Sequence, residues 1–187
     1  GMGEAISRAV TEGLELVKLR REIEQLSIVS TKAVADLTKE LEFQRGIADD
    51  ATLSFKEQNE ALIKSEQLAR QLSNTKIGLA KKEYEEAQKT LAQSNATVDG
   101  YADLQQAEAD AYANYVGLQG EKQQLEQELS KQGRQLKQDE LEKDLDILID
   151  GFDNYKTIKE KELASDKITY EEKIALIREL QAEGAST

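Results

Sequence analysis

The chain has 187 residues, of which 39% are hydrophobic, 33% charged and only 5% aromatic. It contains no histidine, cysteine, proline or tryptophan, which excludes Ser-His-Asp and Cys-His nucleophile systems, ordinary zinc sites, iron–sulfur clusters and disulfide bonds. The formal net charge of -12 disfavours binding to nucleic acid or to an anionic membrane, because both need clustered Lys and Arg.

The composition indicates long helices. Ala, Glu, Lys, Leu and Gln are abundant, which is typical of coiled coils, and no proline is present to break a helix interior. The longest apolar runs span only three or four residues, far below the roughly 20 needed to cross a bilayer. We therefore expect an all-α fold that has no membrane-inserted segment and no cofactor, and that is not an enzyme.

The first predicted helix covers residues 4–48. Its apolar residues recur in steps close to three and four, at Leu19, Ile23, Leu26, Ala33, Leu37 and Leu41. Such a heptad stripe is typical of a helix that buries one narrow face against a partner helix, although Ser30 occupies one position of this stripe. Gly1 and Met2 are typical of a tag-cleavage scar, and we expect the chain to be a fragment of a larger protein.

A sharp corner is predicted before the second helix, which covers residues 54–93. Ser54 precedes Glu57 by three positions, and this pair forms a capping box that satisfies free amide donors at a helix start. Alanines at several apolar positions of the second helix predict a close approach to its neighbour. A further break is predicted at residues 94–100, where turn-forming residues cluster without a capping box.

The third predicted helix is very long and covers residues 98–165. We expect Tyr101, Tyr112 and Tyr115 to serve in packing. The apolar pattern changes phase between Lys137 and Glu140, which predicts altered supercoiling or a change of partner helix. Beyond this point a predicted interaction seam comprises Leu141, Leu145, Leu148, Phe152 and Tyr155. Few helices remain in the chain to cover this seam, so we expect self-association through helices.

An acidic run around Gly151 has some features of a calcium-binding loop. With Gly151 at the invariant glycine position, however, Leu148 would replace an oxygen ligand and Thr157 would replace the bidentate glutamate. The apolar residues of the run keep helical spacing. The run is therefore interpreted as a solvated acidic helix face.

A second capping box is predicted at Thr169 and Glu172, which opens a short final helix over residues 169–183. Short connections favour antiparallel neighbours. The predicted architecture is a single region over residues 1–187, an elongated antiparallel helical hairpin or coiled-coil bundle with one very long helix.

Residues 141–154, together with Thr157, Ile158 and the corner over residues 163–172, resemble coiled-coil regions of tail tape-measure proteins from phages and prophages of Bacteroides-type bacteria. Residues 47–57 are similar to a second segment of that family. The resemblance implies a structural role in setting tail-tube length during assembly, with tail-tube or tail-assembly proteins as partners. It also implies residence in the bacterial cytoplasm and then in the virion tail, and it implies no catalytic residue.

The resemblance and the predicted corners imply different shapes. A tape-measure protein is expected to be an extended rod, whereas the corners predict that the chain folds back on itself. The alternative hypothesis is a coiled-coil adaptor or scaffold of a bacterial secretion or efflux assembly. Such hairpins usually interrupt a β domain, and no alternating strand pattern flanks these helices. An enzymatic or cofactor-binding bundle is the third hypothesis, disfavoured by the absence of histidine and of a phosphate-binding glycine-rich loop.

Overall fold

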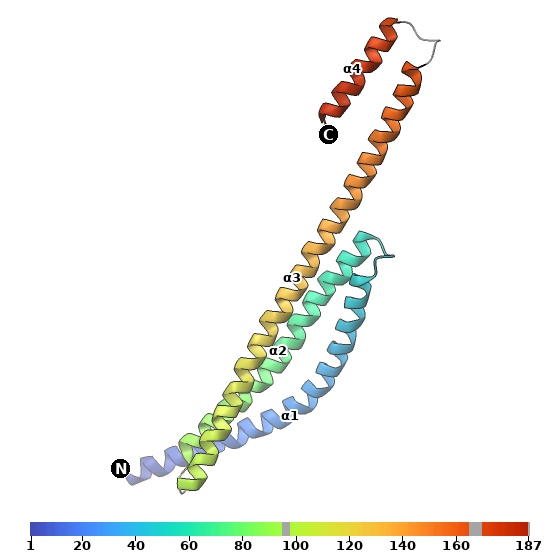
Figure 1. Ribbon diagram of the computed structural model, residues 1–187. Helices are drawn as coiled ribbons and strands as arrows, with labels where there is room; N and C mark the ends of the chain where they lie inside the picture. Colours follow the sequence, from blue (N-terminus) through green and yellow to red (C-terminus); the bar gives the residue numbers. More distant parts are fainter. Residues whose placement is uncertain (95–97, 165–169, 187) are drawn as a thin grey trace. The chain divides into compact units, whose positions relative to one another are not determined.

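The computed structural model describes residues 1–94, 98–164 and 170–186. Within these ranges the protein is all-α, as predicted, and contains no strand (Figure 1). The four helices are α1 (Met2–Asp49), α2 (Phe55–Gln93), α3 (Val98–Leu163) and α4 (Tyr170–Ser186). The sequence predicted them at residues 4–48, 54–93, 98–165 and 169–183. The very long predicted helix is α3, which is 66 residues long.

The chain separates into two compact units, Gly1–Arg134 and Gln135–Thr187, where the sequence suggested one continuous region. Unit 1 contains α1, α2 and residues 98–134 of α3, and unit 2 contains the rest of α3 and α4. The boundary falls beside the change of phase between Lys137 and Glu140. The helix itself continues through the boundary without interruption.

In unit 1, α1 and α2 form an antiparallel hairpin (Figure 1). Gln93 near the end of α2 contacts Glu12 near the start of α1, and Lys82 contacts Glu22. Residue numbers therefore rise along α1 as they fall along α2. The hairpin follows from the short connection at residues 50–54, which leaves the two helices side by side.

Residues 98–134 of α3 pack on this hairpin as a third helix. Glu126 of α3 lies 4.0 Å from Arg70 of α2, and Lys122 donates a hydrogen bond of 3.1 Å to Asn74, which sets α3 antiparallel to α2. Gln132 of α3 donates a hydrogen bond to Asp49 at the end of α1. Unit 1 is therefore a three-helix bundle.

The core of this bundle is narrow and rich in small residues. Its buried apolar side chains are Leu16, Leu19, Leu41, Ala48, Ala61, Leu62, Ala69, Leu72, Ala80 and Leu129. On α2, the small residues Ala61, Ser65, Ala69 and Ser73 are all buried and recur every fourth position, so they share one helix face. Small side chains on that face allow neighbouring backbones to approach closely, as the alanine pattern predicted.

In unit 2, α4 lies against the last turns of α3. The Tyr155 hydroxyl is 3.3 Å from the Glu179 carboxylate, and Lys159 lies 3.8 Å from the same carboxylate. Leu163 of α3 and Ile174 and Leu180 of α4 are half-buried. No helix in the described parts of the chain combines the length and apolar character that a membrane span requires.

Candidate functional site

The corner between α1 and α2 contains the predicted capping box. The Glu57 backbone N–H donates to the Ser54 hydroxyl over 3.3 Å, and the Glu57 carboxylate accepts from the Ser54 backbone N–H over 2.9 Å and from its hydroxyl over 2.7 Å. These contacts satisfy donors that the first turn of α2 leaves without an intrahelical partner. The Ser54 hydroxyl, and then its backbone N–H, hold the pKa of Glu57 below its ordinary value of 4.5.

The loop before this cap is closed by Asp50. Its carboxylate accepts hydrogen bonds from the Thr52 hydroxyl at 2.6 Å and from the Thr52 backbone N–H at 2.9 Å, which is an Asx turn. Both bonds lower the pKa of Asp50, the hydroxyl bond more strongly. The buried Gln58 side chain donates to the Asp50 backbone carbonyl over 2.8 Å. The corner is thus held by side chains at both ends of the loop.

The second predicted capping box falls partly outside the described residues. Thr169 lies outside them, as does part of the predicted break at residues 94–100. Glu172 lies in the first turn of α4 and is exposed. A carboxylate at this position is stabilised by the positive end of the helix dipole.

The structure divides the predicted interaction seam into two parts. Leu141, Leu145 and Leu148 are exposed, whereas Phe152 and Tyr155 are half-buried near α4. The acidic run around Gly151 lies in the continuous helix α3, so it forms no ion-binding loop. The exposed part of the seam is the largest run of exposed aliphatic side chains on the described part of α3, because Ile147 and Ile149 are exposed as well.

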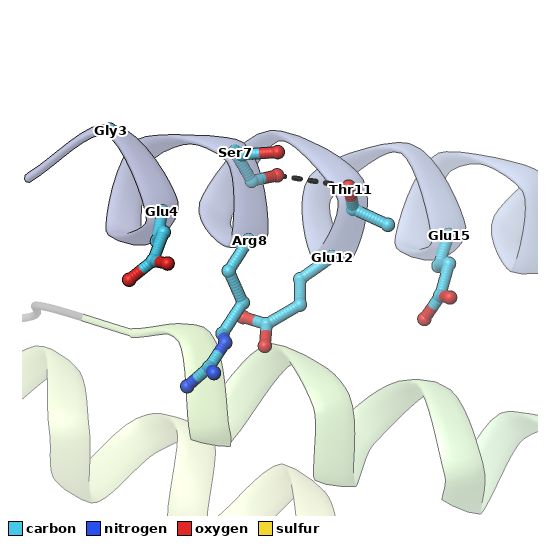
Figure 2. Close-up of a pocket in the computed structure, with 7 residues that line it drawn as sticks. All are labelled: Gly3, Glu4, Ser7, Arg8, Thr11, Glu12 and Glu15. Atoms are coloured by element: carbon cyan, nitrogen blue, oxygen red, sulfur yellow. Dashed lines mark hydrogen bonds between the residues drawn. The ribbon is translucent and has the colours of Figure 1, made fainter. Parts of the chain in front are cut away.

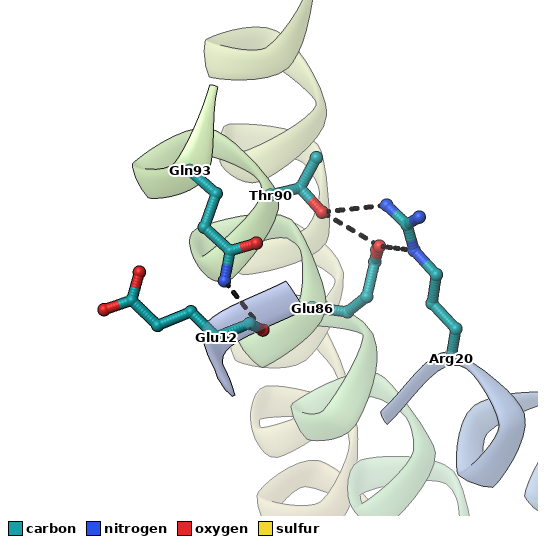
Figure 3. A network of polar contacts seen from close by, with 5 residues as sticks. All are labelled: Glu12, Arg20, Glu86, Thr90 and Gln93. Atoms are coloured by element: carbon teal, nitrogen blue, oxygen red, sulfur yellow. Dashed lines mark hydrogen bonds and ion pairs between the residues drawn. The ribbon is translucent and has the colours of Figure 1, made fainter. Parts of the chain in front are cut away.

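A polar network joins α1 to α2 near the open end of their hairpin (Figure 3). The Glu86 carboxylate accepts from the Arg20 guanidinium at 2.7 Å and from the Thr90 hydroxyl at 2.9 Å, and Arg20 also donates to Thr90 at 3.2 Å. Gln93 donates to the Glu12 backbone carbonyl over 3.1 Å. This network was not predicted, because it depends on the register between two helices and the sequence pattern does not determine that register.

Tyr84 belongs to the apolar pattern that predicted the second helix, but its aromatic contacts were not predicted. Its ring centroid lies 5.3 Å from that of Tyr112 and 6.3 Å from that of Tyr115, so α2 provides the surface on which these two tyrosines of α3 pack. Partial burial, followed by the nearby Glu108 carboxylate, raises the pKa of Tyr84. Tyr101 is exposed and lies outside this cluster.

A cavity of about 300 Å³ lies between the three helices of unit 1. Its lining residues are Ser30, Thr31, Val34, Lys76, Leu79, Ala80, Glu83, Asn114 and Leu118. Ser30 is only 3% exposed, and its hydroxyl has no hydrogen-bond partner among the described residues. The cavity marks the place where serine interrupts the apolar stripe of α1, and it is interpreted as a packing defect.

A shallow hollow of about 610 Å³ lies along the start of α1 (Figure 2). It is lined by Gly3, Glu4, Ser7, Arg8, Thr11, Glu12 and Glu15, all from one helix. The Thr11 hydroxyl donates to the Ser7 carbonyl over 2.9 Å, and such a bond to the preceding turn is common for helical threonine. Groups from a single helix face do not converge on a ligand in the way that binding sites require.

Among the described residues, no three acidic side chains gather in an arrangement that could hold a metal ion. No protein-family model matches the chain, and no curated protein or solved structure is significantly similar to it. On the described surface, the exposed part of the seam on α3 is a candidate contact site.

Proposed function

We propose that the chain is a non-enzymatic structural segment of a phage or prophage tail tape-measure protein, which sets tail-tube length during assembly. The observation that carries this proposal is α3, a single helix of 66 residues that includes the whole of residues 141–154. Those residues resemble the tape-measure family. A helix rises about 1.5 Å per residue, so the length of a helix is proportional to its number of residues. A molecular ruler depends on this proportionality.

The proposal assigns the partners and the location that follow from the role. The protein is made in the bacterial cytoplasm, contacts tail-assembly and tail-tube proteins, and then occupies the tail lumen. The net charge of -12 suits a protein that occupies a DNA conduit, since like charge keeps it from adhering to the phosphate backbone.

The hairpin in unit 1 represents a state outside the tube in this proposal. Among the described residues, the polar side chains of Ser30, Gln44, Gln58, Ser65 and Ser73 are buried, so the bundle gains less from apolar burial than an aliphatic core would. Its helices are also joined by partly exposed ion pairs such as Arg20 with Glu86, and such pairs contribute only about 0–1 kcal/mol. Both features favour a bundle that can open.

The test is a change of tail length. An in-frame deletion of residues 101–121 removes three heptads, which preserves the phase of the apolar stripe. We expect tails about 32 Å shorter in electron micrographs of particles that contain the shortened protein. Duplication of the same segment is the matched control, and it should lengthen the tails by the same amount.

Two results would count against this role. Tails of unchanged length on particles that contain the shortened protein would contradict the ruler. Co-purification of the chain with an outer-membrane channel, and its absence from virions, would favour the adaptor of a secretion or efflux assembly.

A further inference from the structure

The buried positions of α1 and α2 share one heptad phase. At the end of α1 they are Leu41, Gln44 and Ala48, and on α2 they include Gln58, Leu62, Ser65, Ala69 and Leu72. Within each helix the steps between them alternate between three and four. The same alternation continues through the corner at residues 50–54 by way of Ala51 and Phe55, which are both apolar. Two separate helices have no need of a common phase, so this continuity indicates that one helix can run from α1 into α2.

The backbone of the corner differs little from a helix. Asp50 has φ -77° and ψ 98°, and Ser54 has φ -65° and ψ 154°, so both residues have a helical φ and depart from a helix in ψ. Between them, the Leu53 N–H donates to the Asp50 carbonyl over 3.1 Å, which is the bond of a single tight helical turn. The corner contains no glycine, no proline and no positive φ. Rotation about ψ at its two ends can therefore straighten it, as at other hinges.

The contacts between α1 and α2 are centred on the corner. Arg20 and Glu86, which form an ion pair, are each 33 residues from residue 53, and Glu22 and Lys82, which form another, are each 30 residues from residue 52. Two straightened copies that cross antiparallel at their corners would therefore have the same register. Arg20 of one copy would meet Glu86 of the other, and the reverse, as a two-fold axis requires.

The residues around the corner are compatible with such a crossing. With Ala48 at heptad position a, the e and g positions between residues 46 and 60 are Ile47, Thr52, Ser54 and Asn59. None of them is charged, so no like charges oppose each other where the two corners meet. Ala51 and Phe55 lie at the d and a positions and would pack against the same residues of the other copy.

We infer that two copies of the chain exchange α1. In the exchanged dimer α1, the corner and α2 form one helix in each copy, and α1 of each copy packs on α2 and α3 of the other. The exchange breaks the capping box at Ser54 and the turn at Asp50, and it restores intrahelical partners to the backbone groups that the two helix ends leave free. The bundle contacts are kept, now between copies. The exchange does not rest on the ruler role, because it concerns the isolated chain.

The first test is the mass of the refolded chain. The full chain is unfolded in urea and refolded at about 10 μM and at about 1 mM, because mass action favours a dimer at the higher concentration. Light scattering after size exclusion should give the monomer of 20.9 kDa at the lower concentration. At the higher concentration we expect a dimer of twice that mass.

Two substitutions at the corner should move the equilibrium in opposite directions. Ala51→Pro is compatible with the hairpin, because Asp50 already has the extended ψ that a following proline requires and residue 51 is the second position of the turn. In a straight helix the proline would clash with the Ile47 carbonyl, so this variant should stay monomeric. Ser54→Ala removes the cap from the hairpin alone and should raise the dimerisation constant by about tenfold or more.

The second test distinguishes exchange from ordinary side-by-side association. Lys39 and Lys64 are exposed, and spin labels are attached after Lys39→Cys and Lys64→Cys, since the chain has no other cysteine. The labelled chain is refolded at the higher concentration with an excess of unlabelled chain, so that the measured distance lies within one copy. We expect about 38 Å in the dimer, the rise of 25 helical residues. The monomer should give a much shorter distance, because packed helices lie about 10 Å apart.

Three results would overturn the inference. The first is a chain that stays monomeric at every concentration. The second is a dimer that persists in Ala51→Pro, and the third is a dimer in which the two labels are as close as in the monomer, since in both cases the copies would associate with their hairpins closed. Circular dichroism of Ala51→Pro checks that the variant has kept the helical content of the monomer.

Discussion

A Cβ atom added at Gly133 of α3 would lie 3.0 Å from the Cδ2 atom of Leu62 on α2. Leu62 is 3% exposed and has little room to move. The absence of a side chain at Gly133 therefore allows α3 to approach α2 at this level of the bundle. Gly117 and Gly120 lie in the same helix and would meet nothing within 4 Å.

Alanine substitutions at Gly120 and Gly133 should have different effects on the stability of the protein. Gly120→Ala should raise the free energy of unfolding by about 1 kcal/mol, because alanine is the better helix former. Gly133→Ala gains the same propensity but crowds Leu62, and overpacking costs about 1–3 kcal/mol, so its net effect should be zero or destabilising. Urea denaturation measures both. Equal stabilisation by the two substitutions would mean that α2 and α3 do not approach this closely.

The capping box at the α1–α2 corner should contribute measurably to the free energy of unfolding. Ser54→Ala removes the side-chain acceptor for the Glu57 amide and should lower the free energy of unfolding by about 1 kcal/mol at pH 7. Ser54→Asp is the matched control, because aspartate is a comparable N-cap, and it should retain most of the stability. A loss no smaller for aspartate than for alanine would argue against the cap.

The same corner should confer a dependence on pH. The folded-state pKa of Glu57 lies below its ordinary value of 4.5, owing first to the Ser54 hydroxyl. A depressed carboxyl pKa contributes stability that is present above the ordinary pKa and lost as pH falls through the folded-state value. The stability difference between wild type and Ser54→Ala should therefore shrink when urea denaturation is repeated below pH 4.5. Parallel pH profiles for the two proteins would contradict this coupling.

Two buried serines offer a comparison of hydrogen bonding. The Ser65 hydroxyl donates to the Ala61 carbonyl over 2.9 Å, whereas the Ser30 hydroxyl has no partner among the described residues. An unpaired buried polar group costs about 1–3 kcal/mol. Thermal denaturation should show that Ser30→Ala stabilises the protein by about 1 kcal/mol, while Ser65→Ala is neutral or destabilising. If Ser30→Ala destabilises as much as Ser65→Ala, the Ser30 hydroxyl has a partner in solution.

Much of the fold is encoded locally and could be predicted. The absence of proline and the apolar spacing indicated the helices, and the pair Ser54 and Glu57 located a corner, because a capping box involves residues only three positions apart. The long helix was predicted despite its glycines, since each one weakens a helix by about 1 kcal/mol without ending it.

Relationships between helices could not be predicted in the same way. Tyr84 and Tyr112 meet only when α2 and α3 have a particular register, and a heptad pattern is compatible with several registers. The seam illustrates the same limit, because its spacing marks a face for contact without saying which part is covered. Phe152 is half-buried and Leu148 exposed, although both belong to the same apolar pattern.

One helix that runs through two units should show two levels of backbone protection. Around Leu129, which is 1% exposed, the amides of α3 open only when the bundle opens. From residue 141 to residue 150 every side chain is exposed, so those amides are held by the helix alone, and isolated helical segments are marginally stable in water. Hydrogen exchange should therefore divide α3 into a slow part and a fast part within a single unbroken helix.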